Sequence, residues 1–236
     1  FFAIIAFVFK EIVFDIILLG PQKTDFPTYK ALCRISKFLG LDDALCMKVS
    51  PFSLQNISMS GQFSAHITTS IFAGSIVAFP YVFWEFWCFI SPALYDAETK
   101  IARGVVFFSS ALFLFGVLFG YYVIAPLSVN FLGSYQVSST VANQISLTSF
   151  ISTVTTVSLA NGIIFELPIL VYFLTKIGLL TPEFMRMYRK HAMVVTLILS
   201  AIITPPDITS QILVAFPLMI LYELSIKISA RVIKNQ

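Results

Sequence analysis

The chain has 236 residues, of which 58% are hydrophobic and 11% are charged, whereas soluble domains average about 45–50% apolar and about 25% charged residues. With a mean hydropathy of +0.89, this composition excludes a water-soluble globule, a disordered chain and a disulfide scaffold, and the net charge of +3 is too small to indicate a nucleic-acid partner. The excess apolar surface indicates that lipid surrounds the protein.

Six apolar segments are candidates for crossing the membrane, because about 20 apolar residues in a helix span about 30 Å of hydrocarbon. The segments cover residues 1–19, 63–90, 105–124, 147–175, 191–203 and 208–226. They predict an all-α polytopic protein forming a single integral membrane domain over residues 1–236. The chain opens without Met, and the first apolar stretch lacks the basic segment of a signal peptide. We therefore expect Phe1 to be an internal residue of a longer protein and the first segment to be incomplete.

The connection over residues 20–60 is long enough to form an extracytoplasmic cap. Residues at helical spacing predict an amphipathic surface helix within this cap; they are Tyr29, Leu32, Cys33, Ser36 and Leu39. Cys33 and Cys46 either form a disulfide in an oxidising compartment or remain two unpaired residues, because spacing alone does not fix their geometry.

The loop after the second segment places the carboxylates of Asp96 and Glu98 beside aromatic residues. A carboxylate there can bind an arginine guanidinium through two parallel hydrogen bonds, a geometry that lysine does not reproduce. The alternative is a solvated loop in which Glu98 pairs locally with Lys100 or Arg103, and the residues alone favour it.

Gly116 and Gly120 form a GxxxG pattern in the third segment. Small residues at this spacing let two helices approach closely. In a polytopic protein the pattern predicts packing against a neighbouring helix of the same chain.

Glu166 lies near the middle of the fourth segment, where an ionisable group costs about 3 kcal/mol unless it is neutralised, paired or hydrated. The interpretation that we favour is a functional contact with a polar group that enters the helix bundle. The alternative is a protonated carboxyl group hydrogen-bonded to a neighbouring helix. Pro168 beside it predicts a kink.

The fifth segment rises only about 20 Å as a helix, and Pro205 and Pro206 end it. Together with the sixth segment it predicts a shallow hairpin beside which the bilayer is thinned. Asp207 is placed to cap the start of the sixth segment. Gln211 lies one turn further along, where we expect a hydrogen bond across to another helix or a contact with a partner.

Lysine and arginine residues gather on one side of this topology, whereas residues 126–146 on the other side carry no charge. By the positive-inside rule the charged side is cytoplasmic, which places both termini in the cytoplasm. The cap over residues 20–60 then lies outside despite its own cations, because long loops are not topogenic. The residues that set the orientation are Lys100 and Arg103; Lys176, Arg186, Arg189 and Lys190; and Lys227, Arg231 and Lys234.

Four motifs share their order and spacing with a known family. The chain reads F-x-x-P-x-L-Y-x-x-E over residues 89–98, F-E-x-P over 165–168, T-P-P-D-x-x-x-Q over 204–211 and Tyr-Glu at 222–223. This pattern resembles the TatC family, the polytopic subunit of the twin-arginine protein translocase, from about residue 60 to the end. Thr99 stands where the family commonly has Arg.

The resemblance implies a receptor in the cell inner membrane that binds the paired arginines of signal peptides on folded cargo. It also implies assembly with single-span TatA and TatB subunits, as part of a homo-oligomer within a hetero-oligomeric complex, and transport driven by the proton-motive force. No cofactor and no nucleic acid are implied.

Carried over to this chain, the resemblance assigns three groups of residues. The signal-peptide surface comprises Phe89, Pro92, Leu94, Tyr95 and Glu98, with Glu98 as the guanidinium ligand. The intramembrane polar contact is Glu166. The partner-binding site comprises Thr204, Asp207 and Gln211.

Catalytic chemistry is not indicated, because His66 and His191 lie far apart and lack Cys or carboxylate neighbours at metal-ligand spacing. The main alternative is a proton-coupled secondary transporter in which Glu166 carries the proton. An intramembrane enzyme is disfavoured because Glu166 has no polar partner pair in its own segment.

Overall fold

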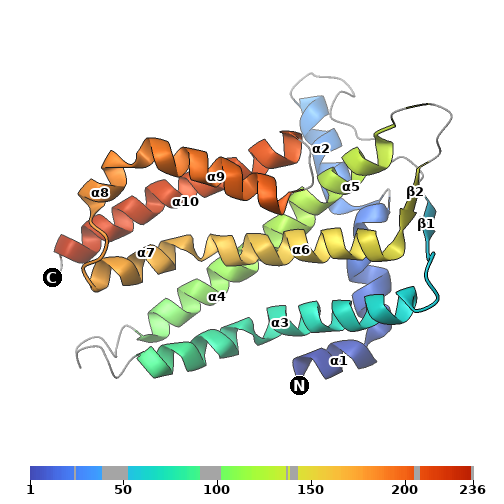
Figure 1. Cartoon of the computed structure of the whole chain (residues 1–236), viewed down its shortest axis with the longest axis horizontal. Coiled ribbons are helices and arrows are strands. Elements are labelled where there is room, and N and C mark those ends of the chain that lie inside the picture. Colours follow the sequence, from blue (N-terminus) through green and yellow to red (C-terminus); the bar gives the residue numbers. More distant parts are fainter. Residues whose placement is uncertain are drawn as a thin grey trace. The chain divides into compact units, whose positions relative to one another are not determined.

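The computed structural model describes residues 1–23, 25–38, 53–90, 102–136, 138, 143–204 and 208–234. Helices dominate this part of the chain, as expected (Figure 1). Its internal contacts divide it into two compact units: Phe1–Val77 with Leu118–Ser158, and Ala78–Val117 with Leu159–Gln236. We describe each unit by itself.

Unit 1 contains the amino-terminal helices, a short two-stranded sheet and the helical elements that precede its second strand. They are α1 (Phe2–Val8), a π-helix (Ile12–Leu18), a 3₁₀ turn (Gly20–Gln22), α2 (Pro27–Phe38), β1 (Ser53–Gln55), a π-helical turn (Gly120–Ile124), α5 (Ala125–Ser134) and β2 (Gln144–Ser146).

Unit 2 contains the carboxy-terminal helices α7 (Leu167–Lys176), α8 (Pro182–Met187), α9 (Arg189–Ile203) and α10 (Ile208–Lys234). The helices α3 (Gly61–Ile90), α4 (Ala102–Phe119) and α6 (Leu147–Phe165) contribute to both units.

Four helical stretches in the described residues are long and apolar enough to cross a membrane: Gly61–Phe89, Gly104–Ser134, Leu147–Lys176 and Ser210–Lys234. They correspond to the second, third, fourth and sixth predicted segments. The fifth segment forms α9, whose 15 residues rise about 22 Å, so the prediction of a short helix is confirmed. The first segment forms two helices of 7 residues each. The total of six crossings and the orientation of the termini stay predictions.

The third segment is longer than the sequence indicated. The prediction that a connection begins at residue 126 was wrong, because the helix continues through the π-helical turn into α5 and ends at Ser134. Pro126 lies in the first turn of α5, where its missing N–H leaves no helical hydrogen bond unmade.

A short parallel sheet adds to the predicted all-α architecture. Strand β1 pairs with β2 in a register that places Leu54 opposite Ile145. Both side chains pack against the core of unit 1. Three residues in each strand are too few for a clear alternating pattern, which is why the sequence did not indicate strands here.

The predicted amphipathic helix is present as α2 and is anchored by Tyr29. This side chain is buried, and its hydroxyl group shares its single hydrogen between the carbonyl oxygens of Pro21 at 2.9 Å and Pro126 at 3.1 Å. Burial raises the pKa of Tyr29 to about 12. Cys33 on the same helix is disulfide-bonded, and Cys46 lies outside the described residues.

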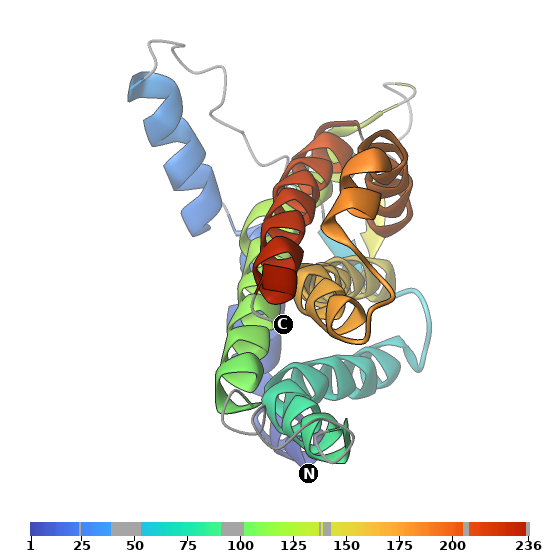
Figure 2. The ribbon, with the colours of Figure 1, turned by 90° about the vertical axis from the view of Figure 1, so that its left-hand side faces the viewer.

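In unit 2, α10 packs along α7, α8 and α9 (Figure 2). Val171 on α7, Met185 on α8 and Ile226 on α10 form a buried cluster that joins three of these helices. A second cluster joins Trp87 at the end of α3 to Val105 and Val106 on α4, with Phe173 of α7 packed against it.

Candidate functional site

Glu166 occupies the break between two helices of one membrane span. Helix α6 ends at Phe165, Glu166 is the N-cap residue that precedes α7, and Pro168 lies in the first turn of α7. Proline cannot donate a backbone hydrogen bond, and its ring clashes with the preceding turn of a continuing helix. The predicted kink is therefore confirmed, and it places the carboxyl group at a point where the helix is interrupted.

The two carboxyl oxygens of Glu166 have different surroundings. Oε2 accepts a hydrogen bond of 2.7 Å from the hydroxyl group of Ser109 on α4. Oε1 is buried and accepts no hydrogen bond from the described residues. A buried polar atom without a partner costs about 1–3 kcal/mol, so a further donor brought to Oε1 would be stabilising.

Close packing between α4 and α6 positions this pair. A Cβ atom on Gly116 would lie 2.7 Å from the backbone oxygen of Asn161 and 2.8 Å from Cβ of Phe165. Reciprocally, a Cβ atom on Gly162 would lie 2.6 Å from Cγ2 of Val117. The prediction that Gly116 packs within the chain is confirmed, because only glycine leaves room for this approach.

Sequence reasoning missed two polar residues of this site. Ser109 on α4 is fully buried and is the observed partner of Glu166. Asn161 on α6 is also fully buried, little more than one helical turn before Glu166. The sequence could have indicated them, because both are polar residues inside apolar segments and such residues commonly form hydrogen bonds between neighbouring membrane helices.

The hairpin of α9 and α10 carries the second predicted polar group. The Nε2 atom of Gln211 donates to the backbone oxygen of Leu197 at 3.3 Å, so the expected hydrogen bond across to another helix is confirmed. Thr204 is buried, and its hydroxyl group donates to the backbone oxygen of Ser200 at 2.8 Å. Asp207 lies outside the described residues, and its capping role stays a prediction.

The predicted signal-peptide surface is described only at Phe89, which lies near the end of α3 and is 83% exposed. Trp87, two residues earlier, is 4% exposed and fixes this end of α3 against α4 and α7. The other residues of the surface lie outside the described residues, and their roles stay predictions; they are Pro92, Leu94, Tyr95 and Glu98.

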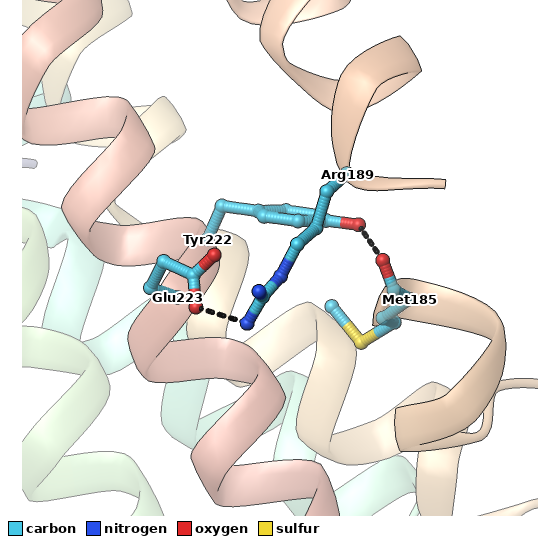
Figure 3. A network of polar contacts seen from close by, with 4 residues as sticks. All are labelled: Met185, Arg189, Tyr222 and Glu223. Carbon is cyan, nitrogen blue, oxygen red and sulfur yellow. Dashed lines mark hydrogen bonds and ion pairs between the residues drawn. The ribbon is translucent and has the colours of Figure 1, made fainter. Parts of the chain in front are cut away.

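The Tyr-Glu motif joins α10 to the helices before it (Figure 3). Arg189 Nη2 at the start of α9 lies 2.8 Å from Glu223 Oε2 on α10. The hydroxyl group of Tyr222 donates to the backbone oxygen of Met185 on α8 at 2.8 Å. The two contacts hold α8 and the start of α9 against α10.

Comparison with known proteins agrees with the motifs. Residues 1–217 match the family model "Sec-independent protein translocase protein (TatC)". A protein of that name from Blattabacterium sp. subsp. Periplaneta americana is 43% identical over 228 residues, which cover 96% of this chain and 86% of the relative. A TatC protein from Helicobacter pylori is 44% identical over 166 residues, which cover 70% of this chain and 66% of the relative.

A solved structure shares the fold as well. The crystal structure of a twin-arginine translocase receptor, TatC, aligns with a TM-score of 0.65 and 31% identity over 98% of this chain and 94% of that chain. TatC is a receptor component of a protein translocase rather than an enzyme. By sequence and by structure, the chain belongs to the TatC family.

Proposed function

We propose that this chain is the signal-peptide receptor and core subunit of a twin-arginine translocase in the cell inner membrane. In this role it binds the paired arginines of signal peptides on folded cargo and assembles with single-span TatA and TatB type subunits. Both termini then lie in the cytoplasm, on the side where the cations of the loops gather.

The observation that carries the proposal is the environment of Glu166. Its carboxyl group is placed at a helix break and uses one oxygen for Ser109, while Oε1 is buried without a donor among the described residues. A polar group of an inserted signal peptide or of a partner helix would supply that donor. This arrangement favours a contact that is completed by a second molecule.

Recognition of arginine is assigned to the loop that follows α3. Phe89 is exposed at the end of that helix, and Trp87 fixes the helix end in the core. Glu98, nine residues further along, is proposed to accept the guanidinium group through paired hydrogen bonds, with Pro92, Leu94 and Tyr95 shaping the same surface.

Partner binding is assigned to the outer end of the α9–α10 hairpin. Gln211 ties the start of α10 to α9, and α9 is too short to cover the hydrocarbon thickness. Thr204, Asp207 and Gln211 together would offer polar groups to a single-span helix at this level. The thinner bilayer there would ease the passage of folded cargo driven by the proton-motive force.

Crosslinking of a twin-arginine signal peptide to the full-length protein in membranes tests the proposal. We expect crosslinks with the unchanged protein, a loss of about tenfold or more with Glu98→Gln, and a similar loss when Lys-Lys replaces Arg-Arg in the peptide. Glu183→Gln, at an exposed carboxylate of α8, is the matched control and is expected to crosslink normally. Equal crosslinking of the Arg-Arg and Lys-Lys peptides would contradict the proposal.

A further inference from the structure

A cavity of about 260 Å³ lies among α7, α8, α9 and α10 of unit 2. Its wall is built mainly from aliphatic and aromatic side chains, together with the hydroxyl groups of Thr196, Tyr222 and Ser225. Each hydroxyl group already donates to a backbone oxygen, that of Met193, Met185 or Leu221 respectively. The interior therefore offers carbon surface to an occupant and no unused hydroxyl donor.

The cavity lies beside the carboxy-terminal part of a candidate membrane span and opens outward. It extends along α7 from Leu167, beside the helix break, to Leu180 beyond the end of that helix, and α7 belongs to the span Leu147–Lys176. Phe184 and Val195 line it while being 49% and 52% exposed. An occupant that enters between these two side chains comes from the lipid, and an acyl chain matches the wall.

A smaller cavity of about 50 Å³ adjoins the first and is polar at one side. The two share Ala192, Thr196 and Tyr222, and the smaller one is also lined by Arg189 and Glu223. Figure 3 shows these two charged side chains reaching toward each other from α9 and α10. A molecule with an apolar tail in the larger cavity would thus have its polar end beside Arg189.

The charge around this end is strongly positive. Arg189 uses one nitrogen for Glu223 at 2.8 Å and is 45% exposed. A guanidinium group has five N–H donors, so it retains donors for a second anion. Arg186 and Lys190 are exposed on either side of it in sequence. Further cations at these helix ends are Lys176, Lys227, Arg231 and Lys234, against the acidic Glu183 and Glu223.

We propose that this place binds an anionic phospholipid, with one acyl chain in the apolar cavity and the phosphate group on Arg189, Arg186 and Lys190. Basic groups at helix ends attract anionic headgroups, and the neighbouring carboxylate of Glu223 is already neutralised by Arg189. The acyl chain fills the space between α7 and the α8–α10 helices. The lipid then acts as a structural ligand that holds the short hairpin against the long helix.

Native mass spectrometry of the purified full-length protein in neutral detergent tests this site. Phosphatidylglycerol is expected to bind about tenfold more tightly than phosphatidylcholine with the same acyl chains. Inorganic phosphate at equal concentration is expected to leave the bound phosphatidylglycerol in place. Equal affinity for the two lipids, or displacement of the lipid by phosphate alone, would overturn the proposal.

Substitutions separate the acyl chain from the headgroup. Ala192→Phe fills the cavity and is expected to lower phosphatidylglycerol affinity at least tenfold, whereas Ala201→Phe, exposed on the same helix and outside the cavity lining, leaves it unchanged. Val195→Trp blocks the opening of the cavity, where Val195 is half-exposed, and is expected to lower phosphatidylglycerol affinity by the same factor. This variant adds no side chain to the buried core, so it separates loss of the lipid site from loss of folding. Unchanged affinity in both cavity variants would refute the acyl-chain site.

The headgroup is tested at the exposed cations Lys190 and Arg186. Lys190→Gln and Arg186→Gln are each expected to lower phosphatidylglycerol affinity about fivefold, equivalent to about 1 kcal/mol per cation, with little effect on phosphatidylcholine. Lys37→Gln on α2 is the charge-matched control. A loss of equal size with Lys37→Gln would show general electrostatic attraction and would overturn the assignment to α8 and α9.

Discussion

Replacing Gly116 by alanine tests whether α4 and α6 approach as closely as the structure shows. The added Cβ atom would lie 2.7 Å from the backbone oxygen of Asn161 and 2.8 Å from Cβ and Cγ of Phe165. Neither contact is with the far end of a flexible side chain, so the helices must separate. Overpacking of this kind costs about 1–3 kcal/mol, and the separation would also lengthen the hydrogen bond from Ser109 to Glu166.

Gly104→Ala on the same helix is the matched control, because a Cβ atom there meets nothing within 4 Å. Alanine is about 0.5–1 kcal/mol more favourable than glycine inside a helix. Because this gain applies to both variants, we expect them to differ by the overpacking cost of about 1–3 kcal/mol, which corresponds to about 2–12 °C in the unfolding midpoint of a chain of this size.

Thermal unfolding in detergent, followed by tryptophan fluorescence, measures this difference. Trp87 is buried against α4 and α7, so its emission reports the loss of packing in the same unit. Equal midpoints for Gly116→Ala and Gly104→Ala would refute the close approach of α4 and α6, and with it the positioning of Ser109 that we infer.

Further predictions concern single hydrogen bonds. Ser109→Ala leaves both oxygens of Glu166 without a donor from the described residues, and we expect thermal unfolding to show a loss of about 1–3 kcal/mol; a change below about 0.3 kcal/mol would contradict the observed pairing. The pKa of Tyr29 rises to about 12 from its ordinary value of 10, so the protonated side chain stabilises the fold fully below pH 10 and this stabilisation is lost as pH rises toward 12. The free energy of unfolding, measured as a function of pH, should show this loss for the unchanged protein and no such loss for Tyr29→Phe. Gln211→Leu removes the bond from α10 to α9 and is expected to reduce co-purification of a single-span partner, whereas unchanged co-purification would remove Gln211 from the proposed partner site.

Much of the fold could be predicted because lipid imposes simple rules on sequence. The second and fourth segments coincide closely with helices long enough to cross a membrane, whereas the helix of the sixth segment continues beyond its predicted end at residue 226 to Lys234. The predicted end of the third segment at residue 124 was wrong, because the helix continues past Pro126 to Ser134. The π-helical turn Gly120–Ile124 precedes α5, so Pro126 lies in the first turn of α5, where proline is tolerated.

The candidate site could be predicted only in part. Glu166 was evident because a carboxyl group stands out in apolar sequence. Its partner was not, because Ser109 lies on a helix remote in sequence and serine is common in membrane helices. The ion pair of Arg189 and Glu223 was also not predicted, since pairing between α9 and α10 depends on the angle and register of the hairpin.

Export of a folded reporter by cells that lack their own TatC tests the central claim most directly. The full-length protein, produced with its single-span partners, is expected to restore export of a reporter carrying an Arg-Arg signal peptide and to fail with a Lys-Lys signal peptide. Glu98→Gln and Glu166→Ala are expected to abolish export while the protein remains in the membrane at normal levels. Full export of the Lys-Lys reporter, or full export by both variants, would contradict the account.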